Sequence, residues 1–93
     1  MKAAVLYGNE EIRCDNWGTP MVKPGAVKVR VRAAGVWGSD VPRVLYHGAH
    51  FYPAVPGHEF SGDVVEAGEG VTELTAGDTV GGAPLVPCMA KSC

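Results

Sequence analysis

A histidine and a glutamate stand side by side at His58-Glu59, between Gly57 and Gly62, and this pair is the strongest candidate for chemistry in the chain. An imidazole and a carboxylate can both bind a metal ion or move a proton. Neighbouring residues of a strand point to opposite faces, so both side chains reach one ion only where the backbone bends, and Gly57 can supply that bend. The alternative is a half-buried histidine held by ordinary hydrogen bonds.

A second candidate pair, Ser39-Asp40, lies upstream. A serine hydroxyl can relay a proton, and an aspartate can accept a hydrogen bond from the far nitrogen of a metal-binding histidine, which here is His58. Serine and aspartate are equally typical of helix starts, where their side chains cap backbone N–H groups. On the residues alone, both interpretations stay open.

The three cysteines, Cys14, Cys88 and Cys93, are odd in number and unevenly spaced. They do not form the even, regularly spaced set of a disulfide-stabilised secreted domain. We therefore expect a cytoplasmic protein whose thiols are available to a metal. For Cys88 and Cys93, which lie near the C-terminus, the alternative is a pair of free thiols.

The composition is that of one small soluble domain of 93 residues, with 46% hydrophobic residues, 19% charged residues and a formal net charge of −2. No nucleic-acid partner is expected, because the only basic cluster, Lys28, Arg30 and Arg32, alternates along an apparent strand. No apolar run approaches the ~20 residues that span a bilayer, so neither a membrane segment nor a secretory signal is expected.

The 13 glycines and 7 prolines separate short apolar runs, a pattern typical of a turn-rich β protein. Expected strands cover 2–7, 12–17, 27–33, 60–67 and 79–83, and a short helix covers 41–46. In the strand at 27–33, valines alternate with basic residues, so we expect it to be half-buried with its charges facing water. The expected architecture is a small β-barrel or sandwich. No Gly-x-Gly-x-x-Gly opens a helix after a strand, so no dinucleotide fold is expected within these residues.

Several motifs follow one another in a characteristic order and spacing: Gly-x-x-Gly-Ser-Asp ending at Asp40, Pro-Gly-His-Glu-Phe-Ser-Gly at 56–62, Val-x-x-x-Gly-x-Gly-Val at 64–71 and Gly-Asp-x-Val at 77–80. Together they resemble the N-terminal part of zinc-dependent medium-chain alcohol and polyol dehydrogenases. The segments 47–53 and 84–88 resemble in particular the galactitol-1-phosphate 5-dehydrogenases of that family.

The resemblance implies a GroES-like β-barrel with one or two short helices over residues 1–93, in which 83–93 begin a structural-zinc lobe. It implies a further Rossmann domain that carries NAD, and oxidation of a secondary alcohol, in a polyol or polyol phosphate, to a ketone at a zinc ion. His58 matches the zinc-binding histidine of the family, and Glu59 matches the neighbouring carboxylate that can approach the metal. Ser39 matches the proton-relay hydroxyl, and Asp40 matches the orienting acid.

The sequence departs from the family pattern at both metal sites. Trp37 stands where the family has its zinc-binding cysteine, and an indole offers only an N–H donor. His58 and Glu59 are then too few ligands for a tight catalytic zinc site. Cys88 and Cys93 match only part of the four-cysteine structural site, and two thiols cannot complete it.

Three hypotheses remain open. The first is the truncated catalytic-domain portion of a polyol dehydrogenase, inactive alone because nothing here holds the hydride acceptor. The second is a non-catalytic GroES-like module or remnant in which Trp37 has replaced metal binding by packing. The third is a zinc-free reductase branch of the same superfamily, which usually lacks the histidine kept here as His58. A truncated barrel is expected to expose apolar surface, which favours marginal stability or a homo-oligomer.

Overall fold

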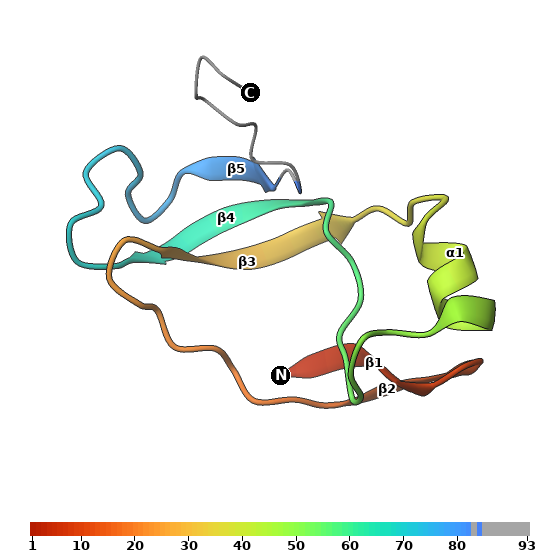
Figure 1. The fold of residues 1–93 in the computed structure, drawn as a ribbon. Helices are drawn as coiled ribbons and strands as arrows, with labels where there is room; N and C mark the ends of the chain where they lie inside the picture. The colour runs from red at the N-terminus through yellow and green to blue at the C-terminus, as the bar shows by residue number, and fades with distance from the viewer. Residues whose placement is uncertain (83, 85–93) are drawn as a thin grey trace, which may run out of the picture.

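The computed structural model describes residues 1–82 and 84 and consists mainly of short antiparallel strands (Figure 1). Its elements, in chain order, are β1 (Lys2–Gly8), β2 (Glu11–Asn16), β3 (Val27–Ala34), α1 (Asp40–Pro42), η1 (Arg43–His47), β4 (Phe60–Ala67) and β5 (Thr79–Gly82). The predicted mostly-β fold with a short helix is confirmed. Each expected strand is found close to its predicted bounds, and position 83, the predicted end of the last strand, lies outside the described residues.

The first two strands form a hairpin that carries most of a small core. β1 and β2 pair antiparallel, with Ala4 opposite Cys14. Val5 and Leu6 of β1 are fully buried, and Val64 of β4 is 2% exposed. These three side chains are the buried apolar core of the described part, which is small for a domain of this length.

An isolated bridge ties this hairpin to the segment that leads into the candidate site. The backbones of Leu6 and Ala54 exchange two hydrogen bonds, at 2.7 and 2.9 Å. Because the bridge pins residue 54 against β1, the extended chain that carries His58 and Glu59 runs from the hairpin up to β4 (Figure 1). The irregular segment between the helix and β4 is therefore anchored near its middle.

The other three strands form a sheet in the order β3–β4–β5, with both pairings antiparallel. Two basic residues of β3 are paired with acidic residues of β4. Arg32 Nε lies 2.8 Å from Asp63 Oδ2, and Lys28 Nζ lies 3.5 Å from Glu66 Oε2. The prediction that these charges face water is confirmed for Arg32, whose side chain is 63% exposed, while that of Lys28 is 27% exposed. The antiparallel register adds an acidic partner to each of them across the strand pair.

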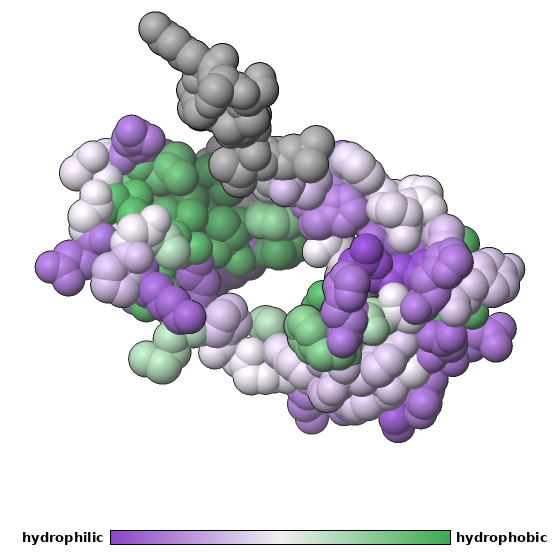
Figure 2. All heavy atoms as spheres, in the orientation of Figure 1, coloured by the Kyte–Doolittle hydropathy of each residue, from purple (hydrophilic) through white to green (hydrophobic). Residues whose placement is uncertain are grey.

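The apolar face of β3 is more open than the alternating sequence indicates. Val31 keeps 54% of its surface exposed, so the prediction of a half-buried strand is wrong for the second half of β3. A shallow hollow lies over this face beside residues 20–26, and Figure 2 shows hydrophobic side chains gathered over this part of the sheet. The strand is exposed because the described part places no second layer over the sheet here.

The helical segment between β3 and β4 begins with one α-helical turn, α1, and continues as a π-helical turn, η1. The predicted helix over 41–46 is confirmed. The segment ends at Gly48, whose φ of 73° and ψ of 179° are accessible almost only to glycine. Within the described part of the chain, no helix is long and apolar enough to cross a membrane.

Candidate functional site

The candidate residues come from two stretches of chain that lie side by side. One stretch follows β3 and covers 35–40, and the other precedes β4 and contains positions 58 and 59. The pairing of β3 with β4 continues beyond the strands, because the Gly35 N–H donates to the Glu59 carbonyl oxygen at 2.9 Å. This backbone bond brings the two predicted pairs of site residues into one region.

Trp37 lies at the centre of this region. Its indole Nε1–H donates a hydrogen bond to Glu59 Oε2. Its ring meets the His58 ring in a T-shaped contact, with 4.5 Å between the ring centroids and 77° between the planes. Both predicted metal ligands are therefore in contact with one tryptophan, which itself stays 40% exposed.

Asp40 is the buried acid of the same region, with 8% of its surface exposed. Its Oδ2 accepts a hydrogen bond from the Trp37 backbone N–H at 2.8 Å. Its Oδ1 lies 3.6 Å from His58 Nδ1, within the range of an ion pair but beyond a normal hydrogen bond. We refer to Trp37, Asp40, His58 and Glu59 as the tryptophan cluster. The predicted role of Asp40 in orienting His58 stays a prediction, with the two side chains now placed together.

The position of the Glu59 carboxylate depends on the absence of a side chain at Gly35. A β-carbon at Gly35 would lie 2.7 Å from Glu59 Oε2 and 3.3 Å from its Cδ. The Glu59 carboxylate thus occupies the space that a side chain at position 35 would take. Any larger residue at position 35 would push it away from the indole of Trp37.

Ser39, the predicted proton relay, lies outside the tryptophan cluster. It is the N-cap residue of α1, yet its side chain makes no capping hydrogen bond. It contributes instead to a separate hollow of about 240 Å³, lined by Ser39, Arg43, His47, Gly48, Ala49 and His50. We refer to this hollow as the basic hollow, after its arginine and two histidines.

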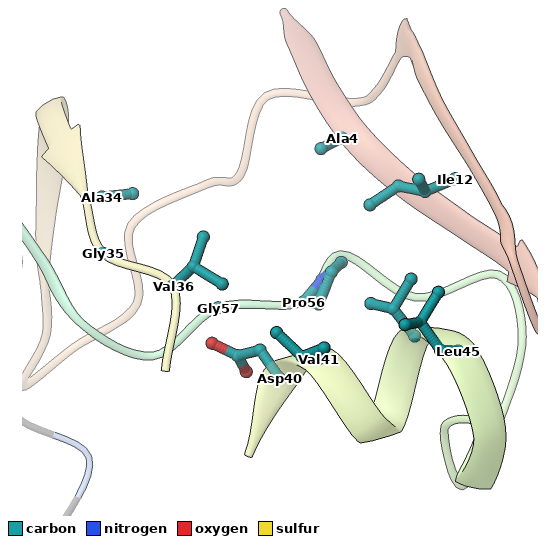
Figure 3. Close-up of a pocket in the computed structure, with 11 residues that line it drawn as sticks. Ala4, Ile12, Ala34, Gly35, Val36, Asp40, Val41, Leu45, Pro56 and Gly57 are labelled. Atoms are coloured by element: carbon teal, nitrogen blue, oxygen red, sulfur yellow. The ribbon is translucent and has the colours of Figure 1, made fainter. Parts of the chain in front are cut away.

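A larger hollow of about 430 Å³ lies between the hairpin, the helical segment and residues 56–57 (Figure 3). Figure 3 shows Ile12 from the hairpin and Leu45 and Val41 from the helix directed into it, with Pro56 between them. Asp40 is the one charged residue among its described lining residues. A polyol presents many hydroxyl groups, and this lining offers them few hydrogen-bonding partners.

The described residues do not fit the catalytic zinc ion that the family resemblance implies. Such an ion needs three protein ligands. Residues 1–82 and 84 contain no group of three His, Cys, Asp or Glu side chains that could hold one. Trp37 contributes no ligand atom, and its N–H already engages a carboxylate oxygen of Glu59.

The cysteines add no ligand to this region within the described residues. Cys14 is exposed on β2 and forms no disulfide there. Cys88 and Cys93, predicted for a structural zinc site, lie outside the described residues, as does most of the predicted structural-zinc lobe at 83–93.

Comparison with known families identifies the class of protein. The family described as "Alcohol dehydrogenase GroES-like domain" matches residues 23–93. The chain therefore belongs to the GroES-like domain family of the alcohol dehydrogenases, and the predicted family and fold are confirmed.

The relatives within this class include polyol dehydrogenases. Galactitol 1-phosphate 5-dehydrogenase of Escherichia coli K12 is 48% identical over 89 residues, which cover 95% of this chain and 26% of the relative. (R,R)-butanediol dehydrogenase of Bacillus subtilis is 39% identical over 93 residues, which cover 86% of this chain and 27% of the relative. The chain thus spans about a quarter of the length of the curated relatives it matches.

Solved structures give the same assignment. Galactitol-1-phosphate dehydrogenase from Escherichia coli superimposes with a TM-score of 0.82 at 38% identity, over all of this chain and 28% of that one. An alcohol dehydrogenase from Escherichia coli CFT073, solved with NADH, superimposes with a TM-score of 0.82 at 34% identity, over 95% of this chain and 26% of that one.

The basic hollow was not predicted from the sequence. A signal was present, because Ser39, Arg43 and His47 recur every four residues across and just beyond the predicted helix over 41–46, a spacing that places side chains on one face of a helix. His50 had no such signal. It joins the hollow only because the chain turns at Gly48.

Proposed function

We propose that this chain is the substrate-side domain of a polyol dehydrogenase lineage in which Trp37 has closed the metal site. The observation that carries the proposal is the double contact of Trp37, whose indole N–H bonds Glu59 and whose ring lies against His58. Both residues that the family resemblance assigns to zinc are engaged by a side chain that cannot bind a metal. The chain alone binds no catalytic zinc and transfers no hydride.

The balance of interactions supports a metal-free cluster. A zinc ion bound through Glu59 Oε2 would compete with the indole N–H of Trp37 for that oxygen. The ion would find only two protein ligands, an imidazole and a carboxylate, whereas a catalytic zinc takes three ligands from the protein. The family position that would supply the missing thiolate is Trp37 itself.

The relatives indicate the setting of the whole protein. We propose polyols or polyol phosphates as its substrate class, NAD as the cofactor of its lineage, a cytoplasmic location and a homo-oligomeric assembly, with neither a nucleic-acid nor a membrane partner. The names of the relatives support the substrate class, since one acts on galactitol 1-phosphate and another on butanediol. In this setting Ser39 offers a hydroxyl to the substrate, and Asp40 holds His58 in place.

The competing candidate is a working zinc-dependent dehydrogenase, and the retention of His58 and Glu59 favours it. Zinc content of the purified chain, measured by native mass spectrometry at neutral pH, separates the two. We expect no zinc on the unmodified chain at equimolar metal. The variant Trp37→Cys adds a thiolate beside His58 and Glu59, so we expect it to carry one zinc ion per chain.

Trp17→Cys is the matched control, because it makes the same replacement at the other tryptophan, at the end of the hairpin. It should gain no zinc. Stoichiometric zinc on the unmodified chain would contradict the proposal and restore the dehydrogenase candidate. Equal zinc uptake by the two cysteine variants would show that position 37 has no special relation to a metal.

A further inference from the structure

The basic residues of the basic hollow differ from Lys28 and Arg32 of the sheet in having no acidic partner within the described residues. The salt bridges within residues 1–82 and 84 join Arg13 to Glu11, Lys28 to Glu66 and Arg32 to Asp63, and the imidazole of His58, which is charged only when protonated, lies beside Asp40. None of these pairs includes Arg43, His47 or His50. In the part of the chain that the structure describes, the three side chains around this hollow keep their hydrogen-bond donors free for a ligand.

The wall of this hollow is held by a hydrogen-bond network. The Tyr52 hydroxyl accepts from the Ala49 backbone N–H at 3.1 Å and donates to Asn9 Oδ1 at 3.0 Å. Asn9 Nδ2 in turn donates to the Tyr46 carbonyl oxygen at 2.9 Å. The loop that carries His50 is thereby fastened to the hairpin and to the end of the helical segment. The same network packs closely against the backbone of Gly48, because a β-carbon at that position would lie 2.8 Å from Asn9 Oδ1.

These donors match a phosphate monoester. Such a group carries about two negative charges and three acceptor oxygens. The guanidinium of Arg43 can bind two phosphate oxygens at once, and each imidazole has at least one N–H donor in either protonation state. The Ser39 hydroxyl adds a donor that can also accept. A lining of this kind suits an anion far better than it suits an uncharged polyol.

We infer that the basic hollow binds the phosphate group of a polyol phosphate. The phosphate part of the inference stands on the hollow itself, and the polyol part rests on the proposed function. Ser39 links the two regions, because it lines the hollow and directly precedes Asp40 of the tryptophan cluster. The basic hollow and the tryptophan cluster therefore meet at adjacent residues of the chain.

Nuclear magnetic resonance titration of the 93-residue chain tests this inference. The ring signals of His47 and His50 are followed as inorganic phosphate, galactitol 1-phosphate or galactitol is added. We expect both phosphates to shift these signals, galactitol 1-phosphate to bind more tightly than inorganic phosphate, and galactitol to have no effect. Arg43→Gln should weaken the binding of galactitol 1-phosphate about tenfold, the loss of one strong charged contact.

Arg30→Gln is the matched control, since it removes the same charge from an exposed arginine on β3, outside the hollow. It should change the affinity less than about twofold, as expected for a distant surface charge. The inference is overturned if no phosphate shifts the histidine signals, if the two arginine variants weaken binding equally, or if galactitol 1-phosphate binds no more tightly than inorganic phosphate. Neither zinc nor NAD is present in this titration. A negative result therefore contradicts the phosphate site alone, and the proposed metal-free site is tested separately by the zinc measurement.

Discussion

The tryptophan cluster and the basic hollow begin at adjacent residues, Asp40 and Ser39, yet their polar groups are used in opposite ways. In the cluster, Glu59 accepts the indole N–H of Trp37 and Asp40 accepts its backbone N–H. In the hollow, the basic side chains have no acidic partner within the described residues. A carboxylate oxygen that already accepts a hydrogen bond within the protein binds a ligand only in competition with that bond, whereas a free donor needs no such exchange. The hollow is therefore the better candidate for binding, although the cluster holds the residues that the family uses for chemistry.

The largest effect on stability is expected from Tyr52→Phe, which tests whether the hydrogen-bond network shapes the hollow. The change removes the hydroxyl that joins Ala49 to Asn9, so we expect a loss of about 1 kcal/mol in unfolding free energy. Because His50 is then less firmly placed, binding of galactitol 1-phosphate should weaken several-fold. Chemical denaturation and the phosphate titration measure the two effects.

Tyr46→Phe is the control for that variant. Tyr46 is 69% exposed, and within the described residues its hydroxyl makes no hydrogen bond, so stability and phosphate binding should both stay unchanged. Equal behaviour of the two phenylalanine variants would remove the argument that the network shapes the hollow.

A smaller effect is expected from Gly35→Ala, which tests the closed state of the cluster. The added methyl group would lie 2.7 Å from Glu59 Oε2, at the end of a flexible side chain that can move away. We expect a loss of less than about 1 kcal/mol in stability, together with a changed indole N–H signal of Trp37 as its acceptor leaves. Gly38→Ala, which has open space around position 38, should leave that signal in place. An unchanged signal in both variants would contradict the described position of the carboxylate.

The smallest effect concerns a basic residue that already has a partner. The hydrogen bond from Arg32, with smaller help from Thr79, holds the pKa of Asp63 below its usual range. A carboxyl with a lowered folded-state pKa stabilises the fold above its unfolded pKa of about 3.9, and this contribution is lost as the pH falls through the folded value. Arg32→Gln should therefore raise the pKa of Asp63 and destabilise the chain slightly near neutral pH, and this difference should disappear in acid.

The pKa of Asp63 is measured by nuclear magnetic resonance of its carboxyl group, and the stability difference is measured by chemical denaturation at neutral and acid pH. The same variant should leave the binding of galactitol 1-phosphate unchanged, because Arg32 is occupied by Asp63 and lies on the sheet. If the pKa of Asp63 does not change, Arg32 is not paired with it as described. If the phosphate affinity falls as far as in Arg43→Gln, paired and unpaired basic residues do not differ in phosphate binding.

The sequence predicted the strands and the helix well because both depend on local patterns. The turns at glycine and proline and the alternating valines of β3 are visible over a few residues. The exposure of Val31 was not predictable, since burial depends on which layer covers a strand, and alternation does not show that. The pairing of Arg32 with Asp63 also depends on register between distant strands.

The sequence predicted the candidate site only in part. The motifs singled out residues that the fold brings together, because Asp40 lies beside His58 and both Asp40 and Glu59 contact Trp37. The substitution at Trp37 was visible, but its two contacts needed the fold. The basic hollow was not predictable, because it depends on a turn in the chain at Gly48 and on hydrogen bonds from the hairpin. No short sequence motif indicates either of these.

In the proposed metal-free site, Trp37 occupies the place of a metal ion. The indole N–H signal of Trp37 tests this proposal in a proton–nitrogen correlation spectrum, recorded while zinc is added to the unmodified chain. Because the N–H is bonded to Glu59, we expect the signal to move in Glu59→Gln and to stay unchanged up to equimolar zinc. If the signal instead shifts together with the ring signals of His58 as zinc reaches one ion per chain, the metal displaces the tryptophan and the proposed metal-free site is wrong.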